Sequence, residues 1–134
     1  MKITQVSVFL QNKQGCLYDA VKTLSDAHID IKTLTLAESK EFGILRLIVD
    51  RPEEAVGKLK AQGHVASLTE IVAVEVDDRP GGLAEVLSAL AKYDINVEYM
   101  YAFVEKSQNK AVLVFRFEDR IGLLLRCRKA ISGC

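Results

Sequence analysis

The sequence predicts an α+β protein built from two ferredoxin-like βαββαβ units in tandem, each an antiparallel sheet with helices on one face. The chain repeats itself at a constant offset, stretches with strand and helix periods alternate, and glycine loops separate them. The identical pairs are Val6/Val72, Val8/Val74, Gly15/Gly81, Leu17/Leu83, Leu24/Leu90 and Ile29/Ile95. We therefore expect a pseudo-symmetric protein whose ligand site exists twice or lies at the seam between the copies.

The first copy, residues 1–70, is expected to form one complete unit. Its predicted elements are a strand at 3–10, a helix at 17–27, strands at 29–36 and 42–49, a helix beginning at Pro52 and closed by Gly63, and a strand at 65–69. Asp50 is expected to cap the second helix, with Glu53 reaching back as in a capping box.

The second copy, residues 71–134, begins in the same way but departs from the repeat after residue 119. Its predicted elements are a strand at 71–76, a loop at 77–82, a helix at 83–93 and strands at 95–104 and 111–118. The Pro-Glu-Glu helix start of the first copy has no counterpart, and the remaining chain is too short for a fourth strand. The second unit is therefore predicted to be incomplete at its C-terminus, so that the strand at 71–76 loses one neighbour.

The composition is that of a soluble globular protein, with 49% hydrophobic and 27% charged residues. No apolar run approaches the roughly 20 residues of a membrane-spanning helix, and the N-terminus lacks the apolar core of a signal peptide. Three cysteines at irregular spacing indicate neither a disulfide framework nor a metal site. We expect a cytoplasmic protein without a membrane partner.

The distribution of charge disfavours nucleic acid as a partner. Residues 120–134 hold four of the 18 basic residues and no acid, which leaves 14 basic and 18 acidic residues in the preceding chain. Binding to phosphates requires clustered lysine and arginine, which this mildly acidic body lacks. The basic tail is interpreted as a solvated terminus.

The sequence contains no recognisable catalytic, cofactor or metal-binding motif. His28 and His64 have no partner at ligand spacing, and the common hydrolase, nucleotide-binding and zinc motifs are absent. Cys16 stands at a helix N-terminus, where the helix dipole can lower a thiol pKa, so a thiol enzyme is one alternative. Its counterpart in the second copy is Gly82, however. We therefore predict a protein that is not an enzyme and carries no cofactor or metal.

The two glycine loops are better candidates for a binding site. Asn12-Lys13-Gln14-Gly15-Cys16-Leu17 and Asp78-Arg79-Pro80-Gly81-Gly82-Leu83 each join a strand to a helix. Glycine allows backbone N–H groups to turn toward a ligand, and a helix N-terminus attracts a carboxylate. The alternative is that asparagine, aspartate and glycine serve here only as ordinary turn and cap residues.

A polar residue follows each loop at the same distance. Asn12 and Asp78 open the loops, and Asp30 and Asn96 stand 18 residues later in the next strand. We expect the loop of a split βαβ unit to lie near the start of that strand. The polar pair and the exposed N–H groups would then hold a zwitterion, with its ammonium on the Asp or Asn oxygens.

The loop Asp-Arg-Pro-Gly-Gly-Leu, followed by a helix and Asp-Ile-Asn-Val, resembles the ACT domain, a small regulatory module of amino-acid metabolism. Asn-Lys-Gln-Gly-Cys-Leu with His-Ile-Asp-Ile is a degenerate version of the same pattern. The resemblance covers about residues 3–119, and the whole chain is similar to stand-alone tandem ACT proteins. It departs at Gln14, which replaces the loop proline, at Asp30, which replaces the strand asparagine, and after residue 119.

The resemblance implies amino-acid binding at the interface of paired domains, without chemistry of the domain's own. In ACT domains the polar residue that opens the loop and the asparagine of the second strand contact the ligand. The ligand-binding residues expected here are Asn12, Gly15, Cys16, Leu17, Asp30, Asp78, Gly81, Gly82, Leu83 and Asn96.

The function predicted from the sequence is a sensor of a small amino acid that acts through its assembly or through a partner enzyme of amino-acid metabolism. The alternative is a structural subunit that pairs through its sheet edge and binds no ligand. A homodimer is expected, because the strand at 95–104 carries Tyr99, Met100, Tyr101 and Phe103 at a possible edge. The other possibility is that the tandem copies satisfy each other within one chain.

Overall fold

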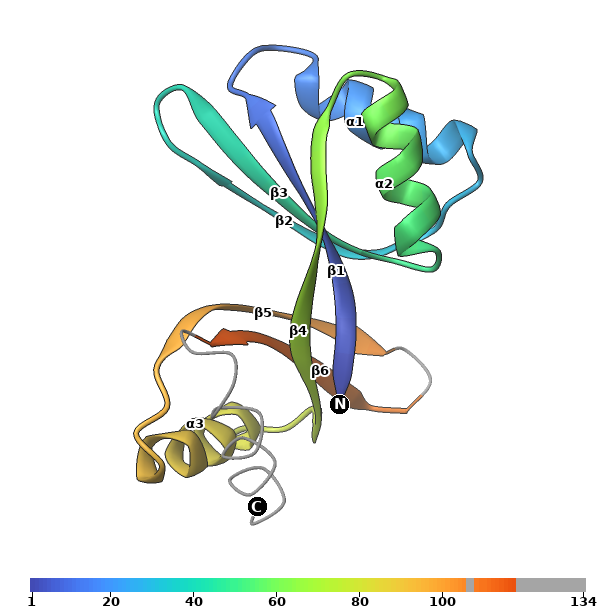
Figure 1. The fold of residues 1–134 in the computed structure, drawn as a ribbon. Coiled ribbons are helices and arrows are strands. Elements are labelled where there is room, and N and C mark those ends of the chain that lie inside the picture. Colours follow the sequence, from blue (N-terminus) through green and yellow to red (C-terminus); the bar gives the residue numbers. More distant parts are fainter. Residues whose placement is uncertain (106–107, 118–134) are drawn as a thin grey trace. The chain divides into compact units, whose positions relative to one another are not determined.

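The computed structural model describes residues 1–105 and 108–117, so the expectations for residues 118–134 lie outside the described residues. The described residues form six strands and three helices, which are labelled in Figure 1. Their bounds are β1 Lys2–Gln11, α1 Cys16–Asp26, β2 Ile31–Glu38, β3 Phe42–Val49, α2 Pro52–Ala61, β4 Val65–Asp77, α3 Gly82–Lys92, β5 Val97–Glu105 and β6 Lys110–Phe117. The expected strands at 65–69 and 71–76 form one continuous strand, β4.

The fold is α+β, with an antiparallel six-stranded sheet in the order β2-β3-β1-β4-β6-β5. The chain divides into two compact units. The N-terminal unit is Thr4–Glu70, and the C-terminal unit combines Met1–Ile3 with Ile71–Cys134. Because β1 and β4 cross the boundary between the units, each of these strands contributes residues to both.

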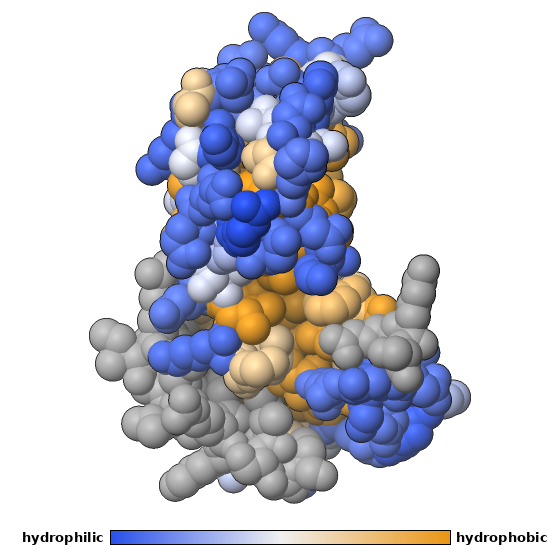
Figure 2. All heavy atoms as spheres, turned by 90° about the vertical axis from the view of Figure 1, so that its right-hand side faces the viewer, coloured by the Kyte–Doolittle hydropathy of each residue, from blue (hydrophilic) through white to orange (hydrophobic). Residues whose placement is uncertain are grey.

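The N-terminal unit has the strand order and helix placement expected of a ferredoxin-like unit. Within it the strands follow β2-β3-β1-β4, and both helices pack on one face. Alternating residues of β1 and β3 meet the apolar stripes of α1 and α2 in one core. The fully buried members of this core are Val6, Val8, Ala20, Leu24, Leu45, Leu47, Ala55 and Leu59. The outer surfaces of α1 and α2 are mainly hydrophilic (Figure 2).

The C-terminal unit completes its sheet with the first residues of the chain. Its strands follow β5-β6-β4, and Met1–Ile3 lie on the free side of β4. The Ala73 N–H donates to the Met1 carbonyl at 2.8 Å, and the Met1 amino group donates to the Ala73 carbonyl at 3.2 Å. The prediction that the strand at 71–76 loses a neighbour is therefore wrong. The segment that lies beside β4 in this unit comes from the N-terminal end of the sequence (Figure 1).

The core of the C-terminal unit relies on aromatic residues of β6. Phe115 is fully buried and stacks on Phe117, with ring centroids 5.6 Å apart and planes 9° from parallel. Val86 and Leu90 of α3 pack against this cluster. The C-terminal core thus combines one described helix with large side chains on the sheet.

The expected capping of α2 by Asp50 is not observed. The N-cap residue is Arg51, and no side chain caps the helix. The Asp50 carboxylate instead accepts the Asp30 N–H at 3.1 Å. Arg51 donates to the carbonyl groups of Ala27 and His28 at 3.1 and 2.6 Å, which ties the start of α2 to the end of α1.

Candidate functional site

The loop between β1 and α1 is folded by its own backbone. Four hydrogen bonds define it: Asn12 N–H to Glu41 O at 2.9 Å, Lys13 N–H to Gln11 O at 2.8 Å, Cys16 N–H to Lys13 O at 3.3 Å, and Asp19 N–H to Gly15 O at 2.9 Å. The first bond holds the loop beside the β2–β3 turn, and the last closes the first turn of the helix.

The loop between β4 and α3 repeats this backbone pattern. Its bonds are Asp78 N–H to Asn109 O at 3.0 Å, Arg79 N–H to Asp77 O at 2.8 Å, Gly82 N–H to Arg79 O at 3.2 Å, and Glu85 N–H to Gly81 O at 3.0 Å. Each donor stands at the position that the constant offset between the copies assigns to its counterpart in the first loop. The repeat seen in the sequence is therefore a repeat of loop conformation.

The first feature that both loops share is a left-handed glycine. Gly15 and Gly81 are the N-cap residues of α1 and α3, and each has a φ of 90°. Residues with a Cβ rarely adopt this conformation, which explains why glycine stands at this point in both copies. Gly82 is restricted for another reason, since a Cβ there would lie 2.9 Å from the Asp77 carbonyl oxygen.

Both loops present backbone N–H groups that the helix does not use. No side chain caps α1 or α3. Among the described residues, Leu17 and Tyr18 in α1, like Leu83 and Ala84 in α3, have no acceptor for their N–H groups. Unpaired N–H groups at the positive end of a helix favour an anion such as a carboxylate.

Charged side chains surround the second loop. Arg79 donates to both carboxylate oxygens of Glu85, at 2.9 and 3.1 Å, and to the Pro80 carbonyl at 3.3 Å. The Glu85 carboxylate raises the pKa of Arg79. The side chain of Asp78 is exposed and has no hydrogen bond or ion pair with any described residue.

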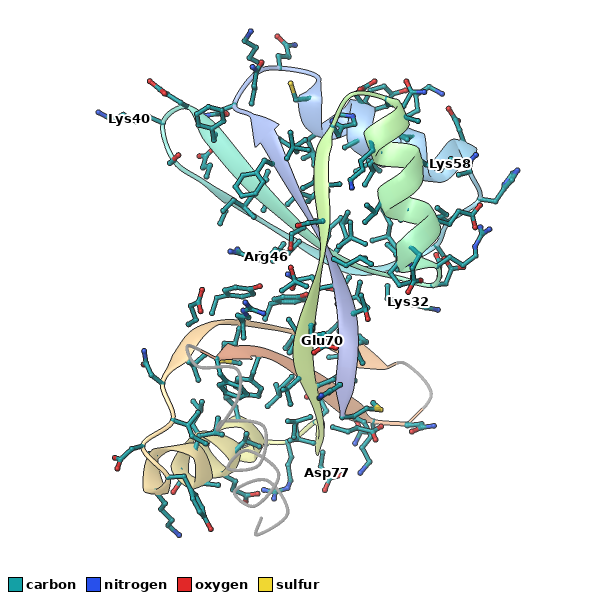
Figure 3. The ribbon with its side chains drawn as sticks, viewed as in Figure 1. Lys32, Lys40, Arg46, Lys58, Glu70 and Asp77 are labelled. Carbon is teal, nitrogen blue, oxygen red and sulfur yellow. The ribbon has the colours of Figure 1, made fainter. Side chains whose placement is uncertain are left out.

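A second ion pair lies at the end of β4, where Figure 3 labels Asp77. The ammonium of Lys110 lies 2.8 Å from the Asp77 carboxylate. This hydrogen bond and the positive charge of Lys110 lower the pKa of Asp77, and Asp77 raises the pKa of Lys110. The pair fixes the end of β4 against β6 immediately before the loop.

The first loop has different side-chain contacts. The Asn12 amide donates to the Lys40 carbonyl at 3.4 Å, at the β2–β3 turn where Figure 3 labels Lys40. Asp19 is the counterpart of Glu85, but its carboxylate lies 3.1 Å from His64 Nε2. Cys16 is half-buried with a free thiol, and no base among the described residues is hydrogen-bonded to it.

The loop and the start of the following strand lie at opposite ends of the sheet in each unit, which corrects the expectation that they are close. In the C-terminal unit Asp77 pairs with Lys110, whereas Val97 pairs with Phe117 at the other end of β6. Seven residues of strand at about 3.3 Å each separate Asp77 from Val97 by about 23 Å along the sheet, and Asp78 and Asn96 lie one residue farther out at the two ends. A split βαβ connection returns along the helix, so the second strand starts where the first one started.

The same separation holds in the N-terminal unit. Gln11 pairs with Phe42 and Ile31 with Val49, again seven residues apart along β3. Asp30 is exposed and lies 3.4 Å from Lys32. Asn96 is exposed as well, and it interacts with another residue of the chain. Within one unit, the structure therefore brings together the loop residues of the candidate site but not their strand partners.

Sequence reasoning missed the side chains that hold the second loop, Arg79 and Glu85. They are six residues apart on either side of the glycine pair, a spacing that corresponds to neither helix nor strand periodicity. The acidic residue in the first turn of α3, Glu85, was the sequence feature that could have indicated this contact.

Other kinds of site find no support in the part of the chain that the structure describes. Its His, Cys, Asp and Glu side chains form no group of three that could hold a metal ion. No described helix has the length and apolar character needed to cross a membrane.

Comparison with known proteins agrees with the repeated loop and the sheet order. A family model for the ACT domain pair matches residues 1–122. The chain belongs to this family. No curated protein matches it significantly.

Solved structures share the fold of this ACT domain pair. Protein BT0572 from Bacteroides thetaiotaomicron has 33% sequence identity and a TM-score of 0.88, with 99% of this chain and 88% of that chain covered. The ligand-free regulatory subunit of aspartate kinase from Thermus thermophilus has 15% identity and a TM-score of 0.66, with 97% and 89% covered. The regulatory subunit from Thermus flavus is similar, with 14% identity, a TM-score of 0.62 and 99% and 94% covered.

Proposed function

We propose that this ACT domain pair is a non-catalytic regulatory module that binds a small amino acid at its glycine loops. The observation that carries the proposal is the loop at Asp78, which an exposed carboxylate opens and which leads into unpaired N–H groups at the start of α3. The N–H groups of Leu83 and Ala84 suit an α-carboxylate, and Asp78 suits an α-ammonium. Membership of the ACT domain pair family supports the same conclusion.

The site requires a second ACT domain. A free amino acid is far shorter than the separation of Asp78 from Asn96, which exceeds the roughly 23 Å between Asp77 and Val97, so these residues of one unit cannot hold the same molecule. Among the strands that the structure describes, β2 and β5 are the two edges of the sheet. If two copies of the chain pair antiparallel through β5, Asn96 of the partner subunit comes to the sheet end that carries Asp78, because Asp78 bonds to the β5–β6 turn.

The edge strand β2 offers a second surface for pairing, because its side chains Leu34 and Leu36 are 44% and 43% exposed. Antiparallel pairing of β2 with its copy places Asp30 of the partner subunit near Asn12, which bonds to the β2–β3 turn. Both arrangements give a homodimer in which ligand and assembly are coupled. The fold shared with regulatory subunits of aspartate kinase supports an enzyme of amino-acid metabolism as the regulated partner.

A thermal-shift screen against the twenty standard amino acids tests this function. A ligand present at 100 times its dissociation constant stabilises the folded protein by about 2.7 kcal/mol. We expect a selective shift for one or two amino acids. In Asp78→Ala the responding amino acid should bind about 10- to 100-fold more weakly, because a hydrogen bond to a charged group contributes ~1.5–3 kcal/mol. The absence of a shift for every amino acid would contradict the proposal.

The alternative function is a structural subunit that pairs through its sheet edge and binds nothing. The exposed Leu34 and Leu36 on the edge strand β2 favour such pairing. Sedimentation of the ligand-free chain at micromolar concentration, together with the screen, separates the two functions. A constitutive dimer that responds to no amino acid would identify the structural subunit.

A further inference from the structure

The two loops share one backbone conformation but differ in what their side chains can offer a ligand. The four donors stand at matching positions, three of the four acceptors do as well, and the bonds have nearly the same lengths in both loops. A difference in binding must therefore come from side chains, and these can be compared position by position between the copies.

The first difference is the charge of the residue that opens the loop. Asp78 provides an exposed carboxylate without a partner among the described residues. Its counterpart Asn12 is neutral, and its amide group donates to the Lys40 carbonyl. An ammonium group binds more strongly to a free carboxylate than to a neutral amide oxygen. This favours the loop at Asp78 as the site for the amino group of a zwitterion.

The second difference is how firmly each loop is held. Arg79 bridges the loop, with two bonds to Glu85 in α3 and one to the Pro80 carbonyl. The counterpart Lys13 has no side-chain partner among the described residues, and Asp19 pairs with His64 outside the loop. A loop that is already fixed in its bound conformation loses less entropy when a ligand binds.

We propose that the loop at Asp78 is the high-affinity amino-acid site of the chain and that Arg79 and Glu85 are its positioning residues. The loop at Asn12 has the same backbone but binds at least tenfold more weakly. This inference rests on the proposed function and adds which of the two repeated loops is used, and why. It predicts one bound amino acid per chain at moderate concentration.

Isothermal titration of the full chain tests the inference, with the amino acid that gives the largest thermal shift as the probe. Arg79→Ala and Glu85→Gln should each weaken binding about two- to fivefold, in line with the strength of an exposed ion pair. Lys13→Ala is the matched control in the other loop and should leave the dissociation constant unchanged. The double variant Arg79→Glu/Glu85→Arg should regain affinity lost in Arg79→Glu, which a general loss of stability would not produce.

The comparison of Asp78→Asn with Asn12→Ala decides between the loops. The inference expects Asp78→Asn to remove binding at the concentrations used, and Asn12→Ala to retain it with one amino acid per chain. Equal losses in both variants, or two equivalent sites per chain, would overturn the inference while leaving the proposed function in place. Failure of the unaltered chain to bind any of the twenty amino acids would overturn both. Unfolding curves without ligand establish that each variant is folded.

Discussion

The two units build the same loop on differently completed sheets. The N-terminal unit takes its four strands from one continuous stretch of chain, whereas the C-terminal unit adds Met1–Ile3 beside β4. The loops nevertheless share their four donor positions and three of the four acceptor positions, and Gly15 and Gly81 both have a φ of 90°. Loop conformation thus depends on local sequence, while the composition of the sheet depends on contacts between distant segments.

The cores of the two units also differ, in the kind of side chain that fills them. The N-terminal core is aliphatic and is covered by α1 and α2, with Leu45 and Leu47 of β3 fully buried. In the C-terminal core β6 contributes the stacked pair Phe115 and Phe117. Large aromatic side chains supply more buried area per residue than leucine. The C-terminal unit should therefore be more sensitive to the loss of one core side chain.

The largest effect is expected from Phe115→Ala. The side chain is fully buried, so its removal should lower the free energy of unfolding by about 3–5 kcal/mol. Hydrogen exchange should accelerate in β6 and in the second half of β4. Protection of β3 should be retained. Equal acceleration in both units would show that they unfold together and would weaken the comparison of separate cores.

A smaller loss of stability is expected from substitutions at the first residue of α1 and of α3, where the first loop carries Cys16 and the second carries Gly82. Gly82→Ala places a Cβ 2.9 Å from the Asp77 carbonyl oxygen, and the necessary shift should cost about 1–3 kcal/mol of stability. The matching position in the first loop already holds a Cβ, that of Cys16, so Cys16→Ala should cost less than about 1 kcal/mol of stability. Denaturant unfolding measures both. A tolerated Gly82→Ala would mean that the backbone around Asp77 can shift to admit a Cβ at little cost.

The smallest effect concerns the ion pair between Asp77 and Lys110, which has no counterpart among the described contacts of the first loop. Because Lys110 lowers the pKa of Asp77, the pair stabilises the folded state above the ordinary carboxyl pKa of 3.8 and is lost as the pH falls through the lowered value. Asp77→Asn should therefore be less stable than the parent near neutral pH, and the difference should shrink below pH 3.8. Unfolding curves across this range check it, and a difference independent of pH would exclude the carboxylate as its cause.

The local features of the fold could be predicted from the sequence. Alternation at Val6 and Val8 and helical spacing at Leu17 and Leu24 identified β1 and α1, and the repeat identified their counterparts. The sequence also placed a glycine in each of the two loops, which the structure shows to be left-handed. The ACT resemblance and the α+β fold are confirmed by the family match and the strand order.

The non-local features could not be predicted. Nothing in Met1–Ile3 indicates that these residues pair with Ala73, since the contact closes a loop of about seventy residues. The long distance from Asp78 to Asn96 follows from the path of the chain through α3 rather than from their constant spacing. Arg79 and Glu85 meet because the loop turns back on the helix, which no periodicity reports.

The central claim, amino-acid binding at the loop of Asp78, is tested most directly by nuclear magnetic resonance of the labelled chain. Each of the twenty standard amino acids is added in turn while the backbone amide signals of both loops are followed. The account predicts saturable shifts at Gly81, Gly82 and Leu83 for one or two amino acids, with much smaller shifts at Gly15, Cys16 and Leu17. Shifts confined to the first loop, or no shift at either loop, would contradict it.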